Sequence, residues 1–327
     1  MVSVALLIGL LLPGVGFHDQ AREARASLAA QAAATGRPKE CSPRGRRAKK
    51  VTVWQKVRFP KLVPYCAHVA RSHALLASDA KAALAEAEAA SKEWPGRPGS
   101  EVAKGRALLA LGKPEEALQA FEAAKKLDEG AIEEPKAIRD FGRALTLRGR
   151  FTEAAAAYRV LVPRAGLLGA NDRATTLLEA AFASMADEAG SDAKPGPEGR
   201  FSEALAFLTE VRESETSPLR AEALLAMALV QDRRGDAAKA TSMSAEASKQ
   251  SVDVSSSPWV ATKADADALR ALALESRDPS AAAEAWAQYL AASPPAAFAA
   301  AARARQTELK KRGAAQPKQP KKTKAGR

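Results

Sequence analysis

The chain has 327 residues, of which 46% are hydrophobic and only 5% aromatic. This is enough apolar material to bury a core, which excludes a wholly disordered chain, and its richness in alanine favours closely packed helices over β-sheet. The net charge of +12 is concentrated in two basic segments, 37–61 and 303–327, so that the remainder is mildly acidic. This distribution argues against a globally cationic nucleic-acid-binding protein.

The first residues, MVSVALLIGLLLPGVG, form an apolar run that is too short to span a bilayer but suits the core of a signal peptide. No Lys or Arg precedes the run, and the small-x-small sequence at 24–26 lies far downstream, so cleavage nearer Gly16, an uncleaved anchor and a buried apolar segment are alternatives. We expect residues 1–26 to be a signal peptide or an N-terminal anchor, with no other transmembrane helix. This predicts export to the periplasm or cell envelope.

Residues 27–63 form a basic segment, and the two cysteines of the chain, Cys41 and Cys66, lie in or next to it. In an exported protein such a pair predicts a disulfide, which would stabilise the fold by roughly 3–4 kcal/mol in the chain-entropy estimate. Two free thiols are the alternative. A metal site of Cys66, His68 and His73 is disfavoured, because residues two apart on a helix point in different directions and no fourth ligand is evident.

Two segments further along the chain share a sequence pattern, which is a glycine, then a Glu-Ala pair, then an aromatic residue four positions after the alanine. They are GKPEEALQAFEAAKKLD, from Gly112, and GRFTEAAAAYRVLVP, from Gly149. Their apolar residues recur at intervals of three and four, which is one face of a helix. Gly112 suits the left-handed end of a preceding helix, and Pro114 is tolerated in the first turn of the next. Each segment is therefore predicted to form the turn and the second helix of a helix-turn-helix unit.

Equivalent small residues recur along the chain, the first two intervals being 34 residues (83 to 117) and 37 (117 to 154). With these features, residues 64–312 resemble the tetratricopeptide repeat family, whose 34-residue unit has small residues at helix contacts and an aromatic on the second helix. The resemblance implies an all-α, right-handed α-solenoid of about six helix-turn-helix units. A generic alanine-rich bundle is the alternative. The residues expected to pack the repeats are Ala83, Gly105, Ala117, Phe121, Gly142, Ala154, Tyr158, Ala204, Ala240 and Ala282.

The pattern weakens toward the C-terminus. An insertion, AGSDAKPGPEG, interrupts one predicted turn, and Ser244 stands where the repeat expects an aromatic residue. A last helix is expected to cap the stack with its charged side chains outward and Leu309 inward. Residues 313–327 lack apolar periodicity and are expected to be a disordered basic tail.

No catalytic constellation, phosphate-binding loop or metalloprotease helix is present in the sequence, so we expect a non-enzymatic protein without a cofactor. By resemblance to the family, the first helices of successive units should line a groove for a peptide or protein. Lys136, Arg139 and Arg143 would face it from one helix and Arg106 from the preceding unit, which favours an acidic segment. The alternative is a solvated face balanced by Asp140. The family's carboxylate clamp needs asparagines, but Arg106 and Arg143 stand where one would be expected.

The predicted function is therefore a scaffold for protein–protein interaction in the cell envelope. An alternative is a protein that binds anionic envelope polymers or lipid headgroups through its basic flanks, where Trp54 and Phe59 could stack or insert. A regulatory domain of a larger enzyme system is a third reading. Nucleic acid is an unlikely partner and would come into question only for a cytosolic chain.

Overall fold

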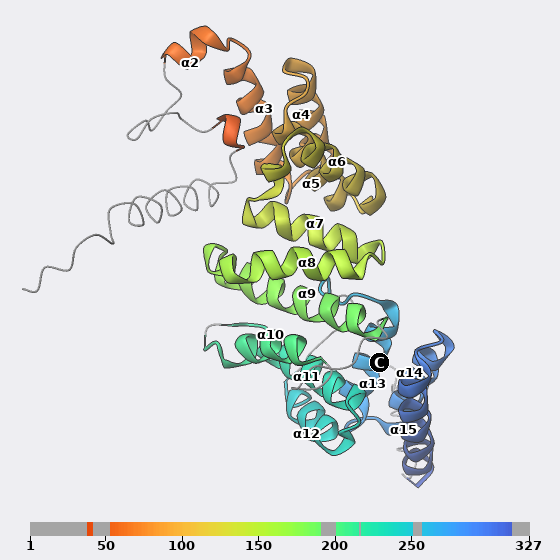
Figure 1. The fold of residues 1–327 in the computed structure, drawn as a ribbon. Coiled ribbons are helices and arrows are strands. Elements are labelled where there is room, and N and C mark those ends of the chain that lie inside the picture. The colour runs from red at the N-terminus through yellow and green to blue at the C-terminus, as the bar shows by residue number, and fades with distance from the viewer. Residues whose placement is uncertain (1–37, 42–52, 191–200, 216, 251–256, 316–327) are drawn as a thin grey trace, which may run out of the picture.

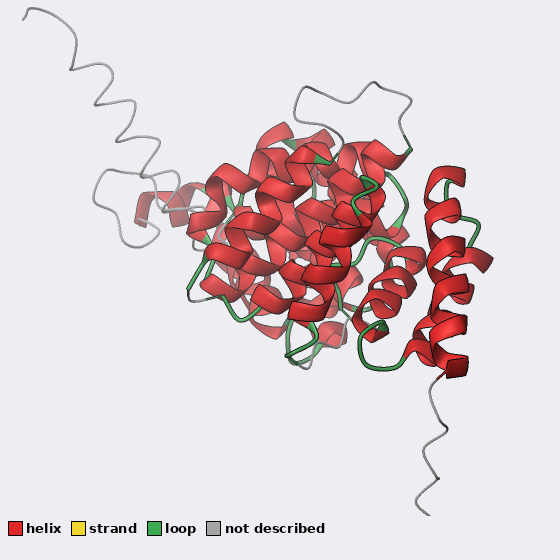
Figure 2. Ribbon diagram, turned by 90° about the horizontal axis from the view of Figure 1, so that it is seen from below, coloured by secondary structure: helices red, strands yellow, loops and turns green. Residues whose placement is uncertain are grey.

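The computed structural model describes residues 38–41, 53–190, 201–215, 217–250 and 257–315. The predicted signal peptide, most of the basic segment 27–63, nearly all of the AGSDAKPGPEG insertion and residues 316–327 of the predicted tail lie outside these ranges. Within them the protein has 14 α-helices and no strand (Figure 2). Neighbouring helices pack in sequence order, which confirms the predicted all-α, solenoid-like fold (Figure 1).

Six antiparallel helix pairs and a last helix build the solenoid, after a short helix at the N-terminal end. Three short 3-10 helices lie among them: η1 (Lys39–Cys41), η2 (Glu129–Ile132) and η3 (Val162–Leu167). The α-helices are α2 (Val53–Arg58), α3 (Leu62–Leu75), α4 (Ala80–Glu93), α5 (Pro98–Ala110), α6 (Pro114–Leu127), α7 (Pro135–Leu147), α8 (Phe151–Leu161), α9 (Ala170–Ala189), α10 (Ser202–Glu213), α11 (Arg220–Arg233), α12 (Ala237–Ala247), α13 (Lys263–Leu274), α14 (Pro279–Ala291) and α15 (Ala296–Ala315).

The turns within the repeats follow from glycine and proline. Gly112 and Gly149 adopt φ values of 73° and 71°, a conformation that costs glycine little. After Gly112, the Lys113 N–H donates to the carbonyl of Leu108 at 3.0 Å, which closes the helix end in a Schellman-type turn. Pro114 then begins α6, where its missing N–H would have had no partner in the helix.

All ten residues expected to pack the repeats are buried. Two glycines permit the closest approach between paired helices. A Cβ added at Gly105 would lie 3.1 Å from the ring of Phe121, and one added at Gly142 would lie 3.0 Å from the ring of Tyr158. The aromatic ring on the second helix thus packs into the space that the small residue on the first helix leaves open, which explains why the sequence pattern recurs.

The odd-numbered helices form the inner layer of the solenoid. Successive odd-numbered helices touch one another in the series α3, α5, α7 and α9, whereas no successive even-numbered pair does so to the same extent in the described part of the chain. In a curved stack, the layer whose members are closest is the inside of the curve. The inner face is therefore built by α3, α5, α7 and α9, as the repeat resemblance implies for first helices.

The C-terminal half departs from this regular stacking. Here α13 contacts α11 more than it contacts α12. The side chain of Trp259, in the loop before α13, lies on Phe182 of α9 with ring centroids 5.2 Å apart. As a result α9 is buried at every position from Thr176 to Met185, and α11 is buried almost throughout. This half of the molecule offers little open inner surface.

The last helix, α15, caps the stack and buries Leu309, but one of its charges points inward rather than outward as expected. Arg305 donates from Nε to Asp232 at 2.7 Å and from Nη1 to Glu275 at 2.8 Å, and all three side chains are nearly buried. The Trp286 indole N–H donates to the same Glu275 at 2.9 Å. The helix also continues to Ala315, beyond its expected end near residue 312.

Candidate functional site

The four cations predicted to face a groove lie on the inner helices α5 and α7, and two of them are neutralised within the chain. Arg106 of α5 donates from Nε to Asp140 of α7 at 2.6 Å, and its side chain is only 10% exposed. Arg139 donates to two acids of α9, Asp172 and Glu179, both at 2.9 Å. These ion pairs tie α5 to α7 and α7 to α9, so Arg106 and Arg139 have a structural role.

One of the two acids that bind Arg139, Glu179, is deeply buried. Glu179 is 4% exposed, and burial raises the pKa of its carboxyl while the adjacent guanidinium of Arg139 lowers it. Removing the arginine would leave an uncompensated buried acid, which is costly. This partner was not predicted from the sequence, although a glutamate inside the apolar run LLEAAF indicates that a cation faces it.

The other two predicted cations remain available. Lys136 is exposed, and neither it nor Arg143 has an ion pair in the described part of the chain. The Nε of Arg143 is buried and has no hydrogen-bond partner among the described residues, and the same holds for the hydroxyl of Tyr158. Arg143 is close enough to Tyr158 and Glu179 to influence both electrostatically. Helix α7 therefore combines an exposed cation with a half-buried, unsatisfied one.

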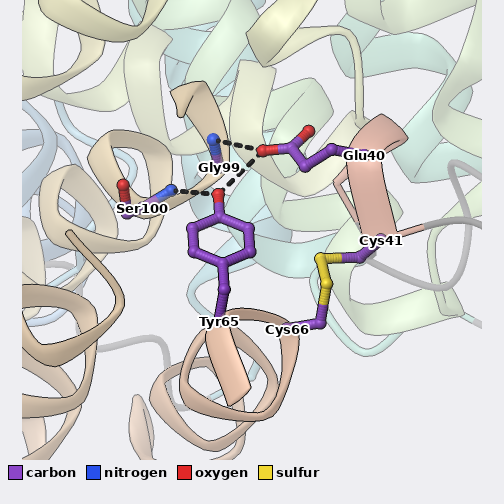
Figure 3. The surroundings of a disulfide bond; sticks show 6 residues. All are labelled: Glu40, Cys41, Tyr65, Cys66, Gly99 and Ser100. Carbon is purple, nitrogen blue, oxygen red and sulfur yellow. Dashed lines mark hydrogen bonds between the residues drawn. A yellow bond between two sulfur atoms is a disulfide. The ribbon is translucent and has the colours of Figure 1, made fainter. Parts of the chain in front are cut away.

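A second constellation, at the N-terminal end, holds a short segment of chain against the solenoid (Figure 3). Cys41 and Cys66 form a disulfide, as the sequence predicts. Next to it, Glu40 accepts hydrogen bonds from the Tyr65 hydroxyl at 2.7 Å and from the Gly99 N–H at 3.1 Å. Burial, and then the neighbouring carboxylate, raise the pKa of Tyr65. Residues 38–41, which we call the strap, are thus fixed by one covalent bond and by polar contacts.

The strap caps a helix that cannot cap itself. Arg97, the residue before α5, makes no side-chain capping bond. The first N–H groups of α5 are instead satisfied from elsewhere: Gly99 donates to Glu40, and Ser100 donates to the Tyr65 oxygen at 3.1 Å. A negative charge at this end of a helix is also favoured by the helix dipole.

The approach of the strap is so close that residue 99 must be glycine. A Cβ at this position would lie 2.5 Å from Pro38 and 2.8 Å from the Tyr65 hydroxyl. A further link is the ion pair between Lys39 and Glu133, at 3.2 Å, which reaches the start of the third helix pair. The sequence predicted the disulfide but gave no indication of this cap.

Among the described residues, no group of His, Cys, Asp and Glu side chains is arranged to hold a metal ion. None of the described helices combines the length and apolar character that crossing a membrane requires. No protein-family model matches the chain, and no curated protein matches it. Inferences about its function therefore rest on its own residues and geometry.

Proposed function

We propose that this protein is a non-enzymatic, tetratricopeptide-like scaffold that binds an acidic segment of a partner protein on the inner face of α7. The observation that carries the proposal is the contrast among the four inner cations. Arg106 and Arg139 are bound to acids of the chain, whereas Arg143 and Lys136 have no such acid in the described part of the molecule.

A buried, unsatisfied guanidinium nitrogen is unusual, because buried polar groups are nearly always hydrogen-bonded. Arginine presents several N–H donors in a planar fork that matches a carboxylate, and such charge-assisted bonds are strong and directional. A carboxylate of a partner would give Arg143 the acceptor that it lacks, while Lys136 would attract a second acid about two helical turns away. The repeat architecture supports this use, since stacked helix pairs present an inner surface.

The proposed location is the periplasm or another part of the cell envelope. Two features support it: the apolar run at the N-terminus, typical of a signal peptide or anchor, and the Cys41–Cys66 disulfide. Disulfides persist in oxidising compartments and are rare in the cytosol. The intact mass of protein from envelope and cytosolic fractions, measured with and without thiol alkylation, tests this part of the proposal.

Fluorescence polarisation tests the binding site itself. The probes are a labelled peptide rich in Asp and Glu and its isosteric Asn and Gln counterpart. We expect the acidic peptide to bind more tightly, and Arg143→Gln to weaken its binding by about tenfold or more, because a charge-assisted hydrogen bond contributes about 1.5–3 kcal/mol. Arg212→Gln removes one positive charge from another surface and should leave binding unchanged. Equal binding of both peptides, or an equal loss in the control, would overturn the proposal.

A further inference from the structure

The N-terminal end of the solenoid carries a concentration of exposed apolar side chains. Val53, Trp54 and Val57 of α2 are 72%, 81% and 71% exposed, and Val63 at the start of α3 is 42% exposed. We call these four residues the Trp54 patch. The other large apolar side chains that are exposed in the described residues are scattered singly over four different elements, as is normal for a protein surface.

The patch is held in place by the residues that follow it. Phe59 lies against Trp94, with ring centroids 5.8 Å apart, and the guanidinium of Arg97 covers the Trp94 ring at 3.8 Å. Leu62 is buried. Because Phe59 and Leu62 anchor the chain after α2, this short helix stands at the N-terminal tip of the solenoid (Figure 1). These two residues fix the point at which α2, with the exposed indole of Trp54, joins the solenoid.

All charged residues of the chain segment that carries the patch are positive. Lys56, Arg58 and Lys61 are exposed and have no ion pair in the part of the chain that the structure describes; Arg58 lies over the Phe59 ring. The sequence contains no Asp or Glu between Glu40 and Asp79. A surface that combines exposed apolar side chains with unpaired cations is complementary to an apolar medium that carries negative charge.

We propose that the Trp54 patch inserts into the headgroup region of an anionic lipid bilayer. Tryptophan favours this interface, because its ring is apolar and its N–H is polar, and lysine and arginine beside it bind anionic headgroups. A small protruding tip offers little area for a protein interface, and lysine is depleted from such interfaces. Shallow insertion together with basic residues gives the two weak contributions that reversible membrane attachment needs. The inference does not depend on the proposed binding of an acidic partner by α7.

The first test is partition of the full-length, oxidised protein onto vesicles of phosphatidylcholine with and without phosphatidylglycerol. We expect binding to the anionic vesicles. Replacing both Trp54 and Val57 by Ser should lower the partition coefficient about a hundredfold, since burying either side chain contributes about a factor of ten. The matched control replaces Leu127 and Val160, exposed apolar residues elsewhere, by Ser and should partition like the unaltered protein.

The second test separates charge from apolar insertion. Replacing Lys56, Arg58 and Lys61 by Gln should reduce partition about fivefold for each cation, or about a hundredfold together, because each contributes about 1 kcal/mol near an anionic surface. The matched control makes the same change at the exposed residues Lys81, Lys126 and Lys310. Since both triple variants lose the same net charge, a general electrostatic effect would lower their partition equally and overturn the proposal.

Depth is measured with lipids brominated on their acyl chains, which quench nearby indoles. Quenching should be lost in Trp54→Phe, while partition largely remains because the ring is still apolar. The proposal fails if the anionic vesicles do not bind the protein, or if quenching is unchanged in this variant. It also fails if the Trp54 and Val57 replacements change only the oligomeric state measured by light scattering, which would make the patch an interface between copies of the chain.

Discussion

Breaking the Cys41–Cys66 disulfide should loosen the N-terminal end of the solenoid specifically. The bridge closes a loop with a sequence separation of 25 residues. In the chain-entropy model, such a loop corresponds to about 3.5 kcal/mol of stabilisation. Besides this effect on the unfolded chain, reduction lets residues 38–41 leave, and Glu40 then no longer accepts from Tyr65 and Gly99. The first turn of α5 would be uncapped, which typically costs about 1 kcal/mol.

Two measurements resolve these contributions. Urea unfolding of the oxidised protein and of a Cys41→Ser, Cys66→Ser variant should differ by about 4–5 kcal/mol in the free energy of unfolding of the N-terminal units, which is the sum of the two contributions. Amide hydrogen exchange should show faster exchange of the Gly99 and Ser100 N–H groups in the variant, whereas amides of α11 and α13 should keep their rates. Because exchange reports each region separately, it suits a repeat protein, whose units contact mainly their neighbours.

Glu40→Ala provides the matched control, since it removes the cap and keeps the disulfide. It should accelerate exchange of Gly99 in the same way but cost only about 1–2 kcal/mol, the magnitude for a helix cap and a buried hydrogen bond. If the double serine variant unfolds at the same urea concentration as the oxidised protein and its Gly99 exchange is unchanged, the strap does not support α5 and the reasoning is refuted.

Three further predictions concern the body of the protein. Phe121→Ala should destabilise it by about 3–5 kcal/mol in urea unfolding, because the ring is fully buried against Gly105, whereas truncation of the half-exposed Leu127 should cost well under 1 kcal/mol. Arg305→Met should cost about 3–5 kcal/mol and increase exchange throughout α15, because two buried carboxylates lose their cation; little change would contradict the ion-pair account of the cap. The hydrogen bond from Arg159 lowers the pKa of the Glu203 carboxyl below 4.5. The ionised carboxylate therefore stabilises the fold at pH values above the pKa of the unfolded chain, and this stabilisation is lost as the pH falls through the lower pKa of the folded state. Glu203→Gln should therefore cost about 0.5–1 kcal/mol at neutral pH after solvent screening and nothing well below pH 4.5; a pH-independent cost would refute this.

The sequence predicted the repeat because its signal is local. The fixed spacing of a glycine, an alanine and an aromatic residue indicates which faces of two adjacent helices pack together. Phe121 and Tyr158 pack as that spacing requires. The signal faded at Ser244, which is buried but too small to fill an aromatic position. At the same point α13 leaves the regular stack, and Trp259 covers α9 instead. Contacts made by a loop insertion have no period from which they could be predicted.

The sites were harder to predict than the fold because their partners are distant in sequence. The sequence placed Arg106 and Arg139 on the right helices, but their neutralisation by Asp140, Asp172 and Glu179 depends on the offset between successive helices. The spacing of residues within one helix gives no information about the offset between two helices. The capping of α5 by Glu40, 59 residues earlier in the chain, is of the same kind.

The geometry of the remaining inner cations limits what a partner can look like. With α9 and α11 almost covered, the open inner surface is confined to the helices α3, α5 and α7, so the partner should supply a short segment. Lys136 and Arg143 are seven residues apart on one helix, a rise of about 10.5 Å. An extended peptide covers this distance in about three residues, so acids at positions i and i+3 should reach both cations. A series of peptides with two acids at separations of one to five residues should therefore bind best at three in the polarisation assay. A flat profile, or the same profile with Arg143→Gln, would show that the two cations do not act together.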